Sequence, residues 1–219
     1  MHLIHQLVSF VVIASYAILL LELIFLHVPS VASVYQLVWI KKSIINYHNE
    51  KLTHGRLYQV LHWPTIKKLL LLGLPTGISI ITGLLPLIYI GCLLTKVCSW
   101  EQLNNISIMQ NIVGMLLIIC GRIFTVYATL VIRQENRQTK ESFQLKTDGV
   151  FGFSRNPLLV GMYVMYVGML VVFPQILFAL GLFVYVLNMH FRILLEEDFL
   201  LFQFGKPFHE YQQHVRRYL

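Results

Sequence analysis

A turn-forming stretch stands directly before an apolar run in residues 148–161, DGVFGFSRNPLLVG. Gly149 permits a positive φ or a close approach of the backbone to another group. Pro157 suits the first turn of a helix, and Asn156 before it is held extended as a natural helix cap. Arg155 adds a fixed cation near the N-terminal end of that helix. A helix N-terminus with an arginine favours a carboxylate or a phosphate, so the stretch predicts an anion-binding turn; a basic membrane flank with a helix cap is the plainer alternative.

A second group of ionisable residues begins at residue 188, in NMHFRILLEEDFLLFQFGKPFHEYQQHVRRYL. Arg192 and Glu196 are four apart and share one helix face. His190 and Glu197 are seven apart and share a second face, about 100° round the helix. Ionisable groups at the end of a membrane span are functional candidates, and a solvated collar of salt bridges is the alternative. An arginine can orient a carboxylate, and a glutamate or histidine can act as a base.

The elements that must position these residues belong to a membrane protein. The 219 residues are 57% hydrophobic and only 12% charged, with a mean hydropathy of +0.68, whereas soluble domains carry about 25% charged residues. The net charge is +7, and most of the basic residues lie between apolar runs. This placement is typical of membrane topology and not of nucleic-acid binding. The three cysteines form no CxxC pair, so we expect neither a disulfide framework nor a metal site.

A membrane helix needs roughly 20 mostly apolar residues. Five stretches reach or approach this length: Leu3–Leu26, Leu69–Leu94, Ile106–Ile132, Leu158–Phe173 and Gln175–Leu195. We expect Pro75 and Pro86 to kink or break the second stretch, and Pro174 to mark a tight turn between the last two. Gly205 and Pro207 should end the last helix before a short amphipathic one. Lysine and arginine are frequent in alternate loops, which predicts an N-terminus outside and a C-terminus in the cytosol.

Two charges fall inside predicted spans. Glu22 lies near the cytosolic end of the first span, and Arg122 lies in the third. A charge buried in a bilayer is costly unless it is paired, and the two residues have similar predicted depths. We therefore predict a structural ion pair between them.

Three stretches resemble one family of membrane enzymes. LKTDGVFGFSRNPLLVGM is similar to the Leu-Val-x-x-Gly-x-Tyr-x-x-x-Arg-His-Pro-x-Tyr-x-Gly stretch of the isoprenylcysteine carboxyl methyltransferase and phospholipid methyltransferase superfamily. RILLEEDFLLFQFGKPFHEYQQHVRRYL resembles its C-terminal stretch, which begins Arg-x-x-x-Glu-Glu-x-x-Leu, and GMLLIICGRIFTVYATL resembles its glycine-marked span. The resemblance covers about residues 110–219 and does not extend to the first 100 residues.

The apolar stretches predict an all-α integral membrane fold with about five transmembrane helices, and the resemblance implies the same class of fold. A cytosolic pocket for S-adenosylmethionine would be formed by the loop before the fourth helix and by the C-terminal helices, and a lipophilic substrate would enter from the bilayer. Residues 1–105 would form an N-terminal membrane region with two spans and a cytosolic amphipathic segment at 31–66. Residues 106–219 would form the methyltransferase-like core with three spans.

The resemblance also implies roles for single residues. Arg192 would face the reacting group of the substrate, and Glu196 would act beside it and hold the cofactor. The other residues implied to bind the cofactor are Phe143, Gln144, Leu145, Gly149, Phe151, Arg155, Asn156, Pro157, Leu158, Leu159, His190 and Glu197. The sequence departs from the family pattern where Asn156 replaces a histidine, Leu159 a tyrosine and Phe143 a histidine, so the cofactor would be held more loosely or differently.

We expect a methyltransferase that uses S-adenosylmethionine and acts on a lipophilic, membrane-borne substrate. A prenylcysteine-like carboxylate, a phospholipid amine and a lipid hydroxyl remain open as acceptors. The alternative is a catalytically inactive relative that serves as a membrane scaffold; a transporter is disfavoured because the polar residues cluster at the ends of the spans. The expected partners are this substrate and membrane lipids, with no nucleic acid, and no oligomeric state is predicted. We favour a multi-pass protein of a bacterial inner membrane over one of the endoplasmic reticulum.

Overall fold

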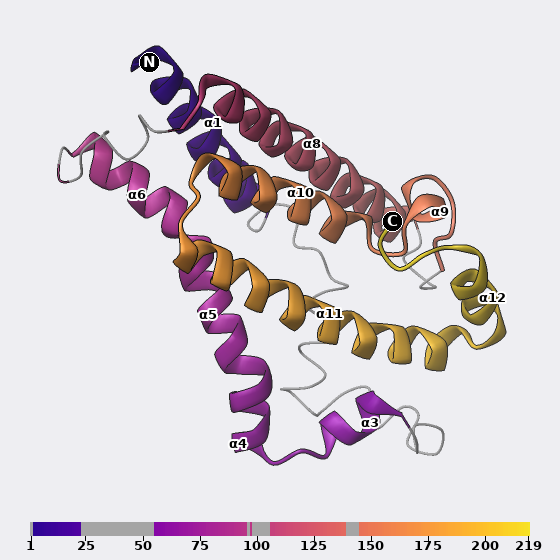
Figure 1. Ribbon diagram of the computed structural model, residues 1–219. Coiled ribbons are helices and arrows are strands. Elements are labelled where there is room, and N and C mark those ends of the chain that lie inside the picture. Colours follow the sequence, from indigo (N-terminus) through magenta and orange to yellow (C-terminus); the bar gives the residue numbers. More distant parts are fainter. Residues whose placement is uncertain (1, 23–54, 96, 98–105, 139–144) are drawn as a thin grey trace.

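The computed structural model describes residues 2–22, 55–95, 97, 106–138 and 145–219. All regular structure in these ranges is helical, which confirms the predicted all-α class (Figure 1). The elements are α1 (His2–Leu21), α3 (Arg56–Leu61), α4 (Thr65–Lys68), the π-helix η3 (Leu69–Gly73), α5 (Leu74–Gly83), α6 (Leu85–Leu94), α8 (Ile108–Gln138), α9 (Val150–Phe153), α10 (Pro157–Val172), α11 (Ile176–Phe204) and α12 (Lys206–His214). The predicted amphipathic segment at 31–66 lies outside the described residues up to residue 54.

Four helical segments of the described chain are long and apolar enough to cross a membrane: Leu3–Leu21, Thr65–Leu94, Ile108–Val131 and Ile176–Phe204. They coincide with four of the five predicted spans, so the chain is an integral membrane protein. The remaining predicted span forms α10, an apolar helix of only 16 residues. The orientation of the chain across the membrane stays a prediction.

Prolines divide the second membrane segment, as predicted. The π-helix η3 ends at Gly73, and Pro75 is the second residue of the α-helix that follows. Proline lacks a backbone N–H and clashes with the preceding turn, and a wider π-turn accommodates both effects. The break between α5 and α6 falls at Leu84, two residues before Pro86. The segment Thr65–Leu94 is still continuous enough to count as one span.

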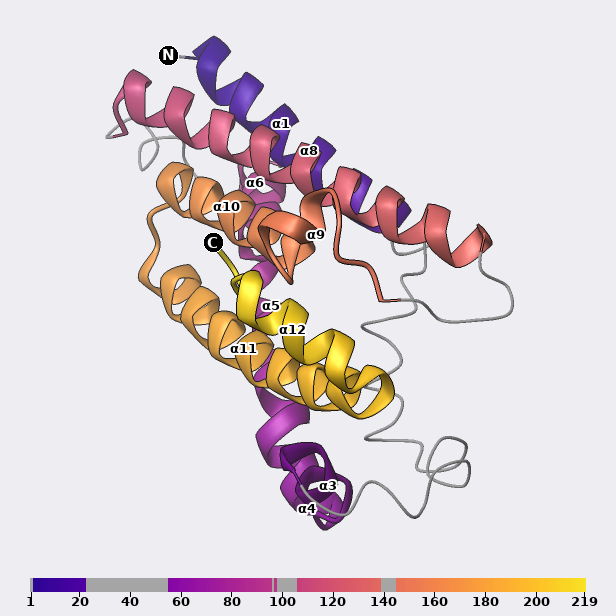
Figure 2. The same ribbon diagram turned by 90° about the vertical axis from the view of Figure 1, so that its right-hand side faces the viewer.

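Glycines let α8 and α10 approach each other closely. Gly121 of α8 lies against Gly161 and Met165 of α10, and Gly114 of α8 lies against Gly168. A Cβ atom at either α8 position would overlap atoms of α10. Membrane helices gain van der Waals contact through such small residues. α1 packs on α8 as well, and the three helices lie together in both ribbon views (Figures 1 and 2).

The predicted ion pair between Glu22 and Arg122 is confirmed. Arg122 Nη1 lies 2.9 Å from Glu22 Oε2, and both side chains are at most one-tenth exposed. The same guanidinium donates from Nε to Ser15 Oγ at 3.2 Å and from Nη2 to Met165 Sδ at 2.8 Å. Arg122 of α8 therefore ties α1 and α10 together within the membrane segment.

The N-terminal region also packs on α11. Gly181 of α11 lies directly against Thr82 of α5. Near the other end of α11, Asp198 Oδ2 accepts hydrogen bonds from the backbone N–H groups of Arg56 and Leu57 at the start of α3, at 2.9 and 3.2 Å. α11 is thus held by two segments from the first half of the chain. It runs as one helix from the membrane segment into the residues predicted to carry chemistry (Figure 1).

Candidate functional site

The turn before α10 has the local structure that its residue types predict. Gly149 has a φ of 59° and precedes the short helix α9. Pro157 is the first residue of α10, and Asn156 occupies the N-cap position. The Asn156 side chain does not cap the helix, because its Nδ2 donates to the carbonyl of Arg217 at 3.1 Å. The Asn156 side chain therefore connects the turn to another segment of the chain, whereas in a simple helix cap it would bond to the first turn of α10.

That other segment is the C-terminal tail, residues 215–219. Gly205, with a φ of 59°, ends α11 as predicted, and α12 turns the chain back along α11 (Figure 2). The backbone N–H of Arg155 donates to the carbonyl of Arg216 at 2.9 Å. The hydroxyl of Ser154, which is fully buried, donates to the carbonyl of Arg217 at 3.4 Å. The tail therefore lies against the turn and is fixed to it by hydrogen bonds to its backbone carbonyls.

Glu197 of α11 lies at the centre of this cluster. Its Oε1 and Oε2 accept hydrogen bonds from Nε and Nη2 of Arg217, at 3.0 and 2.7 Å. Its Oε1 also lies 3.1 Å from Nη1 of Arg155, which makes an ion pair. The two groups are not oriented for a hydrogen bond. The Arg155 side chain is 11% exposed and that of Glu197 is 7% exposed. The hydrogen bonds to Glu197 raise the pKa of Arg217 above its ordinary value. The cluster therefore brings one carboxylate and two guanidinium groups together, largely away from solvent.

His190 contacts the same tail and lies two helical turns before Glu197 on α11. Its Nδ1 lies 2.9 Å from the hydroxyl of Tyr218, and burial raises the pKa of that hydroxyl. The Tyr218 ring in turn packs on Tyr163 of α10, with ring centroids 5.9 Å apart. His190 and Glu197 thus share a helix face, as predicted, and that face is the one that contacts the C-terminal tail.

Arg192 lies on a different face of α11, toward α5. Its Nη2 donates to Thr76 Oγ1 at 2.8 Å, and Asn188 Nδ2 donates to the same oxygen at 3.2 Å. Glu196 follows one turn after Arg192 and is half-buried; no ion pair in the described part of the chain includes it. The structure therefore separates the predicted residues into Arg192, which faces α5, and the ion pair of Arg155 and Glu197, which faces the tail. Glu196 lies between Arg192 and Glu197 along α11.

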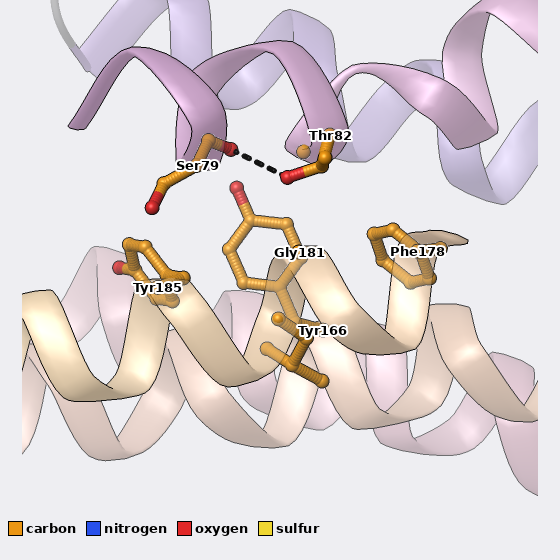
Figure 3. A pocket seen from close by; sticks show the side chains of 8 residues that line it. Ser79, Thr82, Tyr166, Phe178, Gly181 and Tyr185 are labelled. Carbon is orange, nitrogen blue, oxygen red and sulfur yellow. Dashed lines mark hydrogen bonds between the residues drawn. The ribbon is translucent and has the colours of Figure 1, made fainter. Parts of the chain in front are cut away.

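A small pocket opens farther along the α5 side of α11 (Figure 3). Its labelled lining residues are Ser79, Thr82, Tyr166, Phe178, Gly181 and Tyr185. Tyr166 of α10 directs its hydroxyl toward α5 (Figure 3). Gly181, Tyr185, Asn188 and Arg192 are spaced four, three and four residues apart, so they follow one face of α11. This face leads from the pocket within the membrane segment to the guanidinium of Arg192.

The other residues predicted to bind a cofactor have mixed placements. Phe143 and Gln144 lie outside the described residues, and Leu145 is a half-buried residue of the connection before α9. Leu158 packs against the hydrophobic core of α1, α8 and α10, while Leu159 is half-buried beside it. Phe151 contributes its backbone: its carbonyl accepts a hydrogen bond from the hydroxyl of Tyr211.

Four residues that contact the candidate site are not among those predicted to form it: Thr76, Tyr211, Arg217 and Tyr218. Burial raises the pKa of Tyr211 to about 12, so its hydroxyl stays a donor to the turn at neutral pH. In the sequence, Arg217 is one of several basic residues near a membrane span, so its residue type does not single it out. Thr76 stands out in the sequence only as a hydroxyl next to a proline within an apolar span, which is a common and unspecific pattern.

Residues 109–207 match the sequence profile of a single family, described as phospholipid methyltransferase. The match covers α10, α11 and nearly all of α8, and thus includes Arg155, Arg192 and Glu197. No curated protein and no solved structure matches the chain. Residues 109–207 are therefore similar to the phospholipid methyltransferase family, part of the superfamily of integral membrane methyltransferases that the sequence resembles.

Proposed function

We propose that the protein transfers a methyl group from S-adenosylmethionine to a lipophilic acceptor held in the membrane. The observation that carries the proposal is the buried cluster of Arg155, Glu197 and Arg217 at the start of α10, within a chain whose residues 109–207 match a methyltransferase family. A structural ion-pair cluster alone would need no second polar face on α11. Here the same helix carries Arg192 and Glu196 at the same level.

The residues of the cluster fit S-adenosylmethionine chemically. This cofactor presents a carboxylate, an ammonium group and ribose hydroxyls to a protein. Arg155 has a donor for a carboxylate in its buried Nε, which makes no hydrogen bond with the described residues, while its Nη1 is paired with Glu197. Glu196 and Glu197 have acceptors for the ammonium group and the hydroxyls. We assign the holding of the cofactor to these three residues, with Gly149, Asn156 and His190 as the neighbouring wall.

Bound S-adenosylmethionine would supply a methyl group on a positively charged sulfur, and a nucleophile would attack the methyl carbon in line and displace the sulfur. The protein then has to orient the acceptor and exclude water. Arg192 holds an anionic or polar group of the acceptor through its guanidinium. Glu196 accepts the proton when the acceptor is an amine or a hydroxyl, and a carboxylate acceptor needs no base.

The family description favours a phospholipid as the acceptor. A phospholipid amine has a headgroup at the membrane surface and acyl chains in the bilayer. Among the three acceptor classes, we therefore place the phospholipid amine first.

The test measures transfer of tritium from methyl-labelled S-adenosylmethionine into lipid. The purified protein is incubated with vesicles that contain phosphatidylethanolamine, with a prenylcysteine carboxylate, or with a lipid phenol, and the organic phase is counted. We expect labelling of phosphatidylethanolamine that S-adenosylhomocysteine inhibits. Labelling of another acceptor would replace the phospholipid amine and keep the methyltransferase. A well-folded protein that binds no cofactor and labels none of the three would be an inactive scaffold.

A further inference from the structure

Arg192 is held by a residue that lies outside the family-matched part of the chain. Thr76 belongs to α5, and 116 residues separate it from Arg192 in the sequence. Its Oγ1 accepts hydrogen bonds from Arg192 Nη2 at 2.8 Å and from Asn188 Nδ2 at 3.2 Å. The hydroxyl donates its own proton to the carbonyl of Leu72 at 2.5 Å.

These three contacts use the whole hydrogen-bonding capacity of the hydroxyl. A threonine hydroxyl has one donor and two acceptor lone pairs. The bond to Leu72 fixes the direction of the proton, so the lone pairs face α11. Asn188 is buried and occupies one of them, and Arg192 occupies the other. A hydroxyl with all its bonds assigned can hold a long arginine side chain in one rotamer, because any other rotamer loses a charge-assisted bond.

The backbone on both helices sets this contact. Thr76 follows the π-helix η3 and Pro75, where the chain changes its turn width, and π-turns are frequent at functional sites. The close contact of Gly181 with Thr82 fixes the distance between α5 and α11 two turns farther along α5. On the other side of Arg192, Asp198 binds the start of α3. α11 is therefore clamped to the N-terminal region on both sides of Arg192.

We propose that Thr76 is a positioning residue that fixes the guanidinium of Arg192 toward the acceptor. The inference rests on the proposed function, because it is the acceptor that Arg192 orients. It makes the N-terminal membrane region a part of the active site, although that region lies outside the family match. Thr76 touches neither the cofactor nor the reacting atoms, and it acts through Arg192.

The test compares Thr76→Val, which keeps the shape and removes the hydroxyl, with Thr76→Ser, which keeps the hydroxyl. Thr129→Val is the matched control, because the hydroxyl of Thr129, which is buried, likewise donates to a carbonyl four residues earlier in its own helix, that of Thr125. Three quantities are measured: kcat for lipid methylation, the Kd of S-adenosylhomocysteine, and the rate at which phenylglyoxal modifies Arg192, read by peptide mass spectrometry. The third needs no acceptor and no activity.

In Thr76→Val we expect kcat to fall about tenfold and Arg192 modification to be several-fold faster, because a misplaced positioning group costs rate. The Kd of S-adenosylhomocysteine should change less than about twofold, since Thr76 lies away from the cofactor cluster. Thr76→Ser and Thr129→Val should behave like the wild type. If Thr76→Val does not fold, Thr76→Cys serves the same comparison, since a thiol is a weak acceptor.

Two results would overturn the inference. One is unchanged Arg192 reactivity in Thr76→Val, which would mean that the hydroxyl does not hold the guanidinium. The other is an equal loss of kcat, cofactor affinity and thermal stability in Thr76→Val, which would mean a purely structural role. Failure of the proposed function is distinct, because it shows in the wild type as absent cofactor binding and absent methylation. The reactivity of Arg192 still tests the Thr76 contact in that case.

Discussion

The guanidinium of Arg217 binds both carboxylate oxygens of Glu197, at 3.0 and 2.7 Å, and so joins the C-terminal tail to α11. Arg217→Ala should weaken binding of S-adenosylhomocysteine about tenfold, because Glu197 then loses two charge-assisted bonds that fix its orientation. Isothermal titration calorimetry of the two proteins measures this ratio. Arg216→Ala is the control, because the neighbouring side chain is exposed and the contact of Arg216 with the turn is through its backbone carbonyl. Equal affinities of wild type and Arg217→Ala would remove the tail from the site.

The pair of Glu22 and Arg122 should stabilise the membrane segment through mutual neutralisation. Arg122→Leu leaves a buried carboxylate without its partner, which costs about 3–5 kcal/mol. We expect a clear fall in the melting temperature in detergent. Joint replacement of Glu22 and Arg122 by leucine should restore most of the loss, because an apolar pair needs no desolvation. A single variant as stable as the wild type would show that the pair contributes nothing.

The contact of α8 with α10 should tolerate no side chain at Gly121. In Gly121→Ala the new Cβ overlaps the backbone of α10, so the helices must separate, at a cost of about 1–3 kcal/mol. Gly91→Ala makes the same change in α6, where no described atom outside the local helix backbone lies within 4 Å of the new Cβ. It should be neutral or slightly stabilising, because alanine favours a helix over glycine. Thermal unfolding in detergent measures both, and similar melting points for the two variants would contradict the close packing.

Glu196 should matter for the reaction more than for the fold. Glu196→Gln keeps the size of the side chain and removes the charge, so methyl transfer to an amine should fall about 10²–10⁴-fold if Glu196 is the base. Glu210→Gln is the control, because Glu210 is exposed on α12. Rates are compared at saturating cofactor, and the melting temperatures should agree within a few degrees. An unchanged rate for Glu196→Gln would transfer the role of base to another residue or indicate a carboxylate acceptor.

The sequence predicts well those features that local chemistry decides. Proline and glycine positions predict the segmented second span, the positive φ at Gly149 and the end of α11 at Gly205. Charge cost in a bilayer predicts the partner of Arg122, because only one other charge lay at a similar depth in the spans. These cases share a strong local cause, with few alternatives that would satisfy it.

The missed residues depend on how distant helices pack. Nothing near Thr76 in the sequence indicates that α11 will lie against it. The two helices are brought together by the contact of Gly181 with Thr82, and that contact is not visible in the residues around Thr76. Arg217 has the residue type of an ordinary basic flank, and its partner becomes visible only when α12 turns the tail back. Contacts between residues 20 or more positions apart leave no periodic pattern in the sequence, so a pattern along the chain does not reveal them.

Titration of S-adenosylhomocysteine into the purified protein tests the central claim most directly. Calorimetry is run on wild type, Arg155→Ala and Glu210→Gln, each checked for folding by its melting temperature. Micromolar binding by wild type and Glu210→Gln, with loss of at least about tenfold in Arg155→Ala, is the predicted result. A folded wild-type protein that binds no S-adenosylhomocysteine would contradict the proposed methyltransferase and leave the buried cluster of Arg155, Glu197 and Arg217 with a structural role.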